Sequence, residues 1–202
     1  MATTTRSRLA PDERRAQLVA LGLEMLSTRP IEEVSIDDIA AAAGISRGLL
    51  FHYFATKRDF HVAVATAAAE EMLACLSPAD GGSAVDGLAR LRESLAALID
   101  YVDTHRAAYL SLVRGAMSGD PAMQALFEWT RARVTARVLE GFGYRPDGPA
   151  VVPLAVRGWV GFVEDTVTTW LQGDGLGIDR DALLELLERS LLALIRAALD
   201  VA

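Results

Sequence analysis

The chain has 202 residues, of which 51 % are hydrophobic, and a formal net charge of −7 at pH 7. This length and composition suit a globular chain with one substantial core, or a small module joined to a larger domain, and they exclude disordered and collagen-like classes. The N-terminus has no apolar signal region, and the most apolar later segment, residues 150–171, contains Arg157, Glu164 and Asp165. We therefore expect neither secretion nor a membrane span.

Cysteine is too sparse to indicate redox or metal chemistry. The only cysteine, Cys75, cannot form an intramolecular disulfide and has no neighbouring ligand at a metal-binding spacing. One cysteine fits the reducing cytoplasm. We therefore expect a cytoplasmic protein with no cofactor and no metal, in which Cys75 is a small core residue.

Charge is distributed unevenly along the sequence. Residues 1–60 contain eight lysine or arginine residues and eight acidic residues, so residues 61–202, with twelve cations and nineteen acids, carry the whole net charge. The cations of the first segment gather at its two ends, around Arg6 and Arg8 and around Arg47 and Lys57. This pattern favours an anionic partner for the N-terminal segment.

The spacing of apolar residues predicts an all-α protein of about nine helices, because strand-like alternation never persists. The first helix is expected to begin near Pro11 and to end before Pro30. The second is short, with a capping-box pattern of Ser35 and Asp38 at its start and Gly44 placed to end it.

A third short helix is expected over residues 47–54, with Ser46 as its N-cap, and Thr56 with Asp59 should open a fourth. Two short helices joined by a turn of about three or four residues that contains glycine match the helix-turn-helix arrangement. Longer helices follow, and the fourth joins the two units without a flexible linker. Loops are expected at residues 77–83, 143–149 and 173–177, with a helix start at Asp120.

The third predicted helix has side chains that suit a reader of the DNA major groove. Arg47 can reach O6 and N7 of guanine, and Gly48 lets the backbone approach closely. Thr56 and Lys57 offer backbone N–H groups and an ammonium to a phosphate. A structural alternative stays open, because helix-turn-helix geometry also occurs as plain helix packing and aromatic residues at helical spacing usually belong to a core.

The segment VSIDDIAAAAGISRGLLFHYFATKRDF, residues 34–60, closely resembles the DNA-binding signature of the tetracycline-repressor (TetR) family. DIA, AGIS, RG, FHYF and TK stand at the spacing of that family, and the resemblance covers roughly residues 12–60. It implies an N-terminal three-helix helix-turn-helix DNA-binding domain over residues 1–58, with residues 1–10 as a flexible basic arm. A larger helical effector-binding and dimerisation domain would then cover residues 59–202.

The resemblance also implies a set of DNA contacts. Leu49 and Phe51 depart from the family, in which hydroxyl-bearing residues that bind phosphate are common at these places, so they offer only apolar contact. Tyr53 stands where a histidine is common. The expected DNA-binding residues are Ser46, Arg47, Gly48, Leu49, Phe51, His52, Tyr53, Thr56 and Lys57.

Family members dimerise through their last two helices and bind a palindromic double-stranded operator, so the resemblance implies a homodimer. The two corresponding segments here are apolar on more than one side. The expected interface residues are Gly158, Gly161, Asp165, Leu187, Leu191 and Leu194. The alternative is that these helices only close the core of one subunit.

The resemblance further implies a small, largely apolar effector whose binding releases DNA, which favours a repressor. The expected pocket residues are Tyr101, Tyr109, Met117, Phe127, Trp129, Trp159, Phe162 and Thr166, with His105, Arg114 and Glu164 as further candidate polar anchors. For each aromatic residue a plain core position stays open as the alternative.

Two other functions stay open at this point. The larger domain of a DNA-binding regulator can bind a protein partner in place of a small molecule. A helical enzyme is less favoured, because the three histidines lack an H-E-x-x-H spacing and the sequence has neither a glycine-rich phosphate loop nor a G-x-S-x-G motif.

Overall fold

The computed structural model describes residues 10–27, 29–30, 33–76, 84–117, 119–173 and 177–202. Within these ranges it contains nine α-helices and no strand, which confirms the predicted all-α class. The helices are α1 (Pro11–Leu26), α2 (Ile36–Ala43), α3 (Arg47–Tyr53), α4 (Lys57–Cys75), α5 (Ala84–Thr104), α6 (Arg106–Met117), α7 (Pro121–Gly141), α8 (Val151–Gln172) and α9 (Arg180–Asp200).

The predicted caps set the start of the short helices. The Ser35 hydroxyl accepts a hydrogen bond from the N–H of Asp38 at 3.1 Å, and the Asp38 carboxylate accepts one from the N–H of Ser35 at 3.4 Å. Thr56 and Asp59 form the same reciprocal pair at the start of α4. These bonds satisfy N–H groups that have no partner inside the helix.

Gly44 ends α2 and allows α3 to follow after one turn. Its φ of 63° and ψ of 37° lie in the left-handed region, where a Cβ atom is strained. The N–H groups of Gly44 and Ile45 donate to the carbonyls of Ala41 and Ala40, which closes the C-terminal turn of α2. The turn therefore fixes the angle at which α3 leaves α2.

Two buried clusters stabilise the chain. One joins α1–α4 to residues of α6 and α7 and includes Leu18, Ile39, Leu50 and Phe60, none of which has exposed surface. The other joins α5, α8 and α9 around Trp159 and has tyrosine, valine and leucine side chains of α6 and α7 packed against it. Apolar burial on this scale is the main force that holds the helices together.

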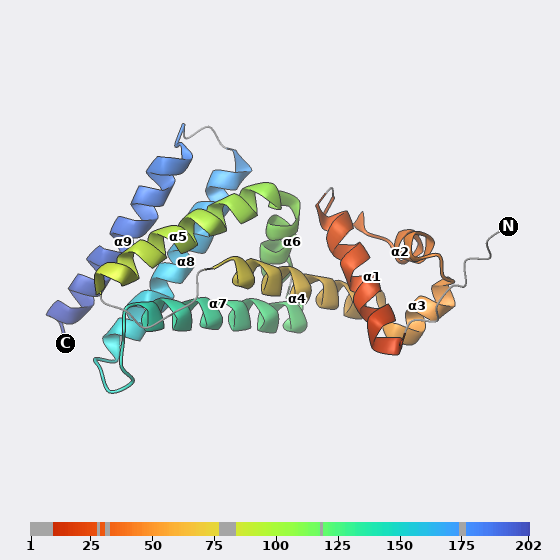
Figure 1. Ribbon diagram of the computed structural model, residues 1–202, viewed down its shortest axis with the longest axis horizontal. Coiled ribbons are helices and arrows are strands. Elements are labelled where there is room, and N and C mark those ends of the chain that lie inside the picture. Colours follow the sequence, from red (N-terminus) through yellow and green to blue (C-terminus); the bar gives the residue numbers. More distant parts are fainter. Residues whose placement is uncertain (1–9, 28, 31–32, 77–83, 118, 174–176) are drawn as a thin grey trace.

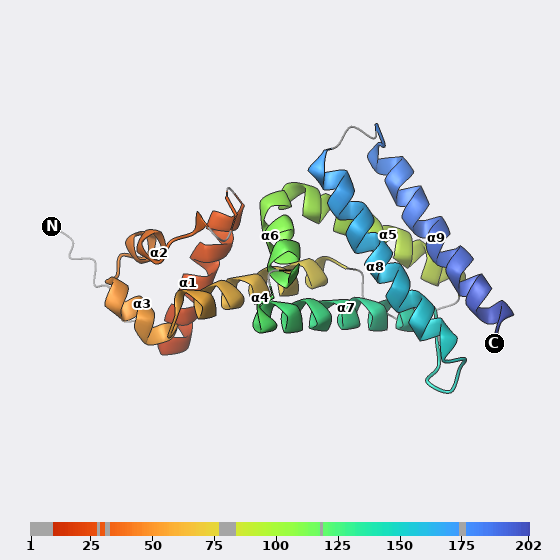
Figure 2. The ribbon, with the colours of Figure 1, turned by 180° about the vertical axis from the view of Figure 1, so that it is seen from behind.

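The molecule is elongated, with α1–α3 at one end and α8 and α9 at the other (Figure 1). We call α1–α3 with the start of α4 the first helical group, and α5–α9 with the end of α4 the second. Helix α4 begins in the first group and runs beside α7 toward the second, as both views show (Figure 2). The domain boundary expected at residue 58 therefore falls in the first turn of α4. The basic arm expected at residues 1–10 lies, apart from Ala10, outside the described residues.

One expectation about the core was wrong. Cys75 is exposed, and it is the last residue of α4, directly before the C-cap residue Leu76. Among the described residues, no helix is long and apolar enough to cross a membrane.

Candidate nucleic-acid interface and internal cavity

Helix α3 presents one side to solvent and buries the other. Leu50 and the following Phe54 pack into the first core cluster, whereas Arg47, Gly48 and His52 are exposed. Ser46 begins the helix, and its hydroxyl accepts a hydrogen bond from the N–H of Leu49 at 3.2 Å. Leu49 is itself exposed, while Phe51 and Tyr53 are half-buried against the cluster.

Arg47 is held at the surface by neighbouring groups. Its Nη1 atom lies 3.2 Å from the Asp37 carboxylate, and its guanidinium lies 5.7 Å from the ring centre of Phe51. Both members of the ion pair are largely exposed, and such pairs contribute little to stability. A competing acceptor can therefore take Arg47 from Asp37 without disturbing the fold.

The start of α4 lies directly after α3. Thr56 is its N-cap, Lys57 is its first residue, and both are exposed. The ring of Tyr53 meets the ring of His52 edge-on, with 5.4 Å between their centres. The nine residues expected to contact DNA lie within the segment 46–57, interrupted by the buried Leu50 and Phe54, and Phe51 and Tyr53 are the less exposed members of the set.

The second helical group contains a cavity between α4, α5, α6, α7 and α8. The cavity has a volume of about 110 Å³ for the centres of water molecules, far more than a single water molecule needs. Its wall is mostly apolar. The polar side chains in the wall are Arg90, Ser94, Tyr109, Thr130, Arg137 and Glu164.

The structure brings together only some of the residues expected to line a pocket. Tyr109, Phe127 and Trp159 line the cavity, and so does the candidate anchor Glu164. The remaining expected residues, which do not line it, are Tyr101, His105, Arg114, Met117, Trp129, Phe162 and Thr166. Met117 is 76 % exposed and Trp129 is 41 % exposed, while the Tyr101 hydroxyl donates to the carbonyl of Ala68 at 3.2 Å.

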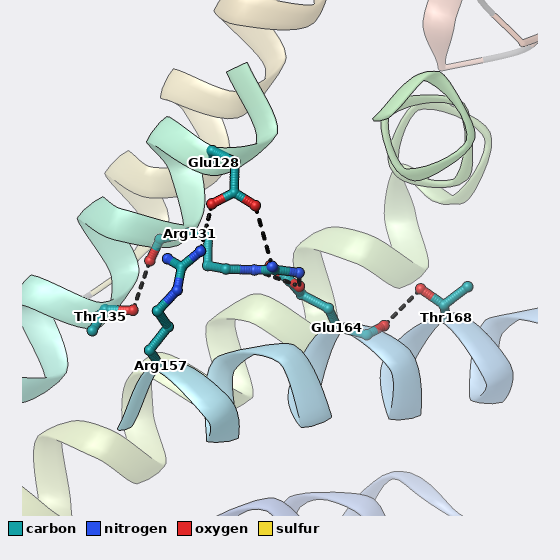
Figure 3. Close-up of polar contacts among 6 residues, drawn as sticks. All are labelled: Glu128, Arg131, Thr135, Arg157, Glu164 and Thr168. Atoms are coloured by element: carbon teal, nitrogen blue, oxygen red, sulfur yellow. Dashed lines mark hydrogen bonds and ion pairs between the residues drawn. The ribbon is translucent and has the colours of Figure 1, made fainter. Parts of the chain in front are cut away.

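An ionic network connects α7 to α8 beside the cavity (Figure 3). Arg131 donates to the Glu164 carboxylate and lies 3.3 Å from Glu128, which also accepts from Arg157 at 2.5 Å. The hydrogen bond with Glu164 raises the pKa of Arg131, and the bond with Arg157 lowers the pKa of Glu128. The charge of Glu164 is therefore compensated within the protein.

Tyr109 brings a hydroxyl into the cavity wall. Burial is the main cause that raises its pKa to about 12, a hydrogen bond with Thr168 opposes this change, and the nearby Glu164 adds to it. The phenol therefore stays protonated at neutral pH. It can offer a ligand an O–H donor but no charge.

Sequence reasoning missed Arg90 of α5 and Arg137 of α7 as cavity residues. Both stand at helical spacing from residues that also line the cavity: Arg90 lies four residues before Ser94, and Arg137 lies three after Val134. The sequence did contain a signal for them, because each arginine lies on the otherwise apolar face of its helix. It is a weak one, because long arginine side chains often cover apolar surface while their charge stays in water.

A bidentate ion pair links the first helical group to the second. Arg58 of α4 places Nε 2.6 Å and Nη2 2.5 Å from the two carboxylate oxygens of Asp120, the N-cap residue of α7. The same carboxylate accepts the N–H groups of Ala122 and Met123. Arg58 is the main cause that lowers the pKa of Asp120, and the two N–H groups also lower it against an opposing effect of burial.

Replacing Asp120 separates its two roles. Asp120→Asn should keep an oxygen that caps α7 but lose the charge that pairs with Arg58, whereas Asp120→Ala loses both. We expect the alanine variant to have the lower melting temperature in a thermal scan at pH 7. Because the native pKa of Asp120 is lowered, its charge stabilises the folded state fully above the ordinary pKa of about 4, and this stabilisation is lost progressively as pH falls from there through the native value. Equal melting of the two variants would contradict the capping role.

The residues expected at a dimer interface fall into two sets. Gly158 and Gly161 have open space where a Cβ atom would lie, and Asp165 and Leu194 are exposed. Leu187 and Leu191 are fully buried within the subunit, in the cluster of α5, α8 and α9, so they have no exposed surface for a partner. Other exposed apolar side chains on these helices are Leu154, Phe162, Leu186, Leu192 and Leu199.

Comparison with known proteins assigns both helical groups. Residues 18–64 match the model of the bacterial regulatory proteins of the tetR family, and residues 88–194 match the tetracyclin repressor-like C-terminal domain. The chain belongs to the TetR family. It is therefore a DNA-binding transcriptional regulator, and α2 and α3 are its helix-turn-helix.

Relatives of this TetR-family chain are similar along most of its length. The HTH-type transcriptional activator FasR of Mycolicibacterium smegmatis is 25 % identical over 181 residues, which cover 89 % of this chain and 81 % of FasR. The crystal structure of a tetR-family regulator from Streptomyces coelicolor is 31 % identical, with a TM-score of 0.82 over 96 % of this chain and 85 % of that one. A TetR-like regulator from Rhodococcus sp. RHA1 is 26 % identical, with a TM-score of 0.64 over 92 % and 97 % of the two chains. All three are named as regulators, not as enzymes.

Proposed function

We propose that this TetR-family regulator is a homodimeric repressor that reads a palindromic operator with α3 and releases it when a small, largely apolar effector enters the cavity. The observation that carries the proposal is the combination, in one chain, of an exposed capped helix bearing Arg47 and an apolar cavity in the second helical group. Helix α4 touches both. Its N-terminus adjoins α3, and Met72 near its C-terminus lines the cavity.

The exposed side of α3 supports a division of roles among the DNA contacts. Arg47 has the planar donors that recognise guanine in the major groove, and Gly48 leaves room for a close approach. Lys57, with the N–H groups at the start of α4, suits a phosphate. The half-buried Phe51 and the exposed Leu49 offer apolar contact alone.

A dimer is proposed because one short helix reads too few base pairs for useful specificity. Two-fold dimers place their recognition helices about 34–36 Å apart, which is one turn of DNA. The open space beside Gly158 and Gly161 on α8 and the exposed Leu194 on α9 support these helices as the contact surface. The subunit-buried Leu187 and Leu191 would support that surface from beneath.

For an effector to release DNA, a structural change at the cavity must be transmitted to α3. Helix α4 provides one path, and the pair of Arg58 with Asp120 provides a second, because it connects the first turn of α4 to the start of α7. A ligand that shifts α7 relative to α4 would therefore change the orientation of α3. Coupling of this kind is a difference in ligand affinity between two arrangements of the protein.

The experiment that tests DNA reading is selection of bound sequences from a random duplex pool by the purified protein at near-physiological salt. We expect a palindrome with half-sites about one helical turn apart. Transcription in vitro from a promoter that contains this sequence then tests the sign of regulation. The repressor proposal expects less transcript when the protein is added; more transcript would make the protein an activator, as the name of the M. smegmatis relative describes that protein.

Alanine substitutions separate base reading from phosphate binding. Arg47→Ala should relax base preference at one operator position at a cost of about 1–3 kcal/mol. Lys57→Ala should weaken binding to all sequences and flatten the slope of log affinity against log salt by about one unit. Fluorescence anisotropy with operator and scrambled duplexes measures both effects.

Arg145→Ala is the matched control, because this exposed arginine lies in the loop between α7 and α8 and pairs with Asp147 two residues later. It should bind DNA like the parent protein. If Arg47→Ala also kept full base preference, the recognition surface would have to lie elsewhere.

A further inference from the structure

The two ends of the cavity differ in charge compensation. The residues of α7 that line it run from Phe127 to Gly141, a distance of about 20 Å along the helix axis. Near the Phe127 end, Glu164 is paired with Arg131. Near the Gly141 end, the wall contains Arg90 of α5 and Arg137 of α7. Among the described residues, neither arginine lies within 4.0 Å of a carboxylate oxygen.

Arg90 contains a buried donor that no described residue of the chain uses. Its Nη2 atom donates to the carbonyl of Gly141 at 3.0 Å, which satisfies one carbonyl at the C-terminal end of α7. Its Nε atom is buried and, within the described part of the chain, has no hydrogen-bond partner. A buried donor without an acceptor is unfavourable, so the described part of the chain does not satisfy this guanidinium completely.

Arg137 is the second cation at this end. Its Nη1 atom donates to the carbonyl of Leu73 and lies 3.5 Å from the carbonyl of Leu76, both at the C-terminal end of α4. A guanidinium has five N–H donors and keeps its charge at all relevant pH values. Backbone carbonyls engage part of each group but carry no full charge, so these two positive charges have no anionic partner among the residues that the structure describes.

The backbones at this end pack closely. A Cβ atom at Gly87 would lie 2.7 Å from the Gly141 carbonyl oxygen, so only glycine allows α5 to come this near to the end of α7. The close approach places Arg90, one turn further along α5, within reach of that same carbonyl. The position of the Arg90 guanidinium is thus set by backbone geometry.

We propose that Arg90 and Arg137 bind the anionic head group, a carboxylate or a phosphate, of an amphipathic effector. Leu91, Leu95 and Val134 then surround its apolar body. The inference rests on the proposed effector-binding function and names the chemical class of the effector. Planar guanidinium groups suit this role because they can give two parallel hydrogen bonds to one carboxylate or phosphate. An uncharged effector would leave both charges without an anion, and a cationic one would be repelled.

The test compares four probes with the same eight-carbon body: octanoate, octyl phosphate, octanamide and octylammonium. Binding is followed by the fluorescence of Trp159, which lines the cavity, in a Trp129→Phe, Trp170→Phe background that removes the other two tryptophans. We expect octanoate or octyl phosphate to bind about ten- to a hundredfold more tightly than octanamide, and octylammonium most weakly. The tighter of the two anions identifies the head group.

Substitutions at Arg90 test whether its charge is responsible. Arg90→Gln should lose most of the preference for the anion over octanamide, and a thermal melt of the ligand-free variant measures separately the loss of the hydrogen bond to the Gly141 carbonyl. Arg90→Lys should keep part of the preference. Arg92→Gln is the control, since Arg92 lies on the same helix, is exposed and pairs with Glu188; it should bind all probes like the parent protein.

The outcomes separate this inference from the proposed function. If octanamide binds as tightly as octanoate and octyl phosphate, or if Arg90→Gln keeps the anion preference, the head-group assignment is overturned while an apolar effector site survives. If no probe changes the fluorescence of Trp159, the anion assignment also fails. The effector role itself is tested apart from this, by whether any compound that stabilises the protein releases the selected operator.

Discussion

Trp159→Ala is expected to lower the free energy of unfolding by about 3–5 kcal/mol, the range for removing a large aromatic side chain from a packed core. Only 2 % of the residue is exposed, and it lies where α8 packs against α9. Its indole N–H donates to the carbonyl of Leu187 and to the hydroxyl of Ser190, each at 3.0 Å. The substitution therefore enlarges an existing cavity and also removes two hydrogen bonds of the indole N–H group, although the Leu187 carbonyl keeps the one that it accepts from the Ser190 hydroxyl. Urea unfolding followed by circular dichroism measures the loss.

Two further variants test whether the expected loss of stability depends on the indole N–H group and on the buried position of Trp159. Trp159→Phe keeps most of the ring but removes the N–H donor, so it should cost clearly less than the alanine change. Trp170→Ala removes the same kind of side chain from a half-buried site near the end of α8, where the indole donates to Ile178, and should also cost less. A loss of unfolding free energy below about 1 kcal/mol for Trp159→Ala would mean that Trp159 contributes little to the packing of α8 against α9.

Gly48→Glu is expected to weaken operator binding by about a hundredfold or more while the protein stays as stable as before. Only the Ser46 hydroxyl lies within 4 Å of where a Cβ atom would be, and it is 4.0 Å away, so the fold has room for a side chain. Glutamate also favours a helix more than glycine does, by roughly 0.5–1 kcal/mol. On the proposed DNA-facing side, however, the side chain would hold α3 away from the bases and add negative charge beside phosphates. The loss corresponds to about two base contacts at about 1–3 kcal/mol each.

The comparison variants for this prediction are Gly48→Ala and Ala136→Glu. The alanine change adds one methyl group, so it should raise stability slightly and weaken binding less than glutamate does. Ala136→Glu adds the same charge to an exposed position of α7, distant from α3, and should leave DNA affinity unchanged. Anisotropy titrations and thermal melts on the same samples report both properties. Full operator affinity in Gly48→Glu would exclude this side of α3 from the DNA contact.

Local rules made the helix-turn-helix predictable from sequence. The cap pairs Ser35 with Asp38 and Thr56 with Asp59, and the left-handed Gly44, act within one turn of the chain, so residue types a few positions apart are sufficient to identify them. The structure confirms each of these local features. The exposed position of Arg47 and the burial of Leu50 follow from the same helical spacing.

The cavity was much less predictable, because its wall depends on how five helices pack. Phe127 and Trp129 lie two positions apart and therefore on nearly opposite sides of α7, so only one of them can face the cavity, and helical spacing does not say that it is Phe127. Arg90 and Arg137 were missed because a lone arginine on an apolar stripe usually extends to solvent. Cys75 was misplaced because the final residue of a helix can be exposed even where its apolar neighbours Leu73 and Leu76 are buried.

Trp159 connects the cavity to α9 by direct contact, since its ring forms part of the cavity wall and its N–H group bonds to Leu187 and Ser190. If α9 also forms the subunit contact, occupation of the cavity and association of subunits become linked equilibria, and each must change the other by the same factor. Effector affinity would then depend on protein concentration. Titrations carried out well below and well above the dimer dissociation constant would give different values for the same compound.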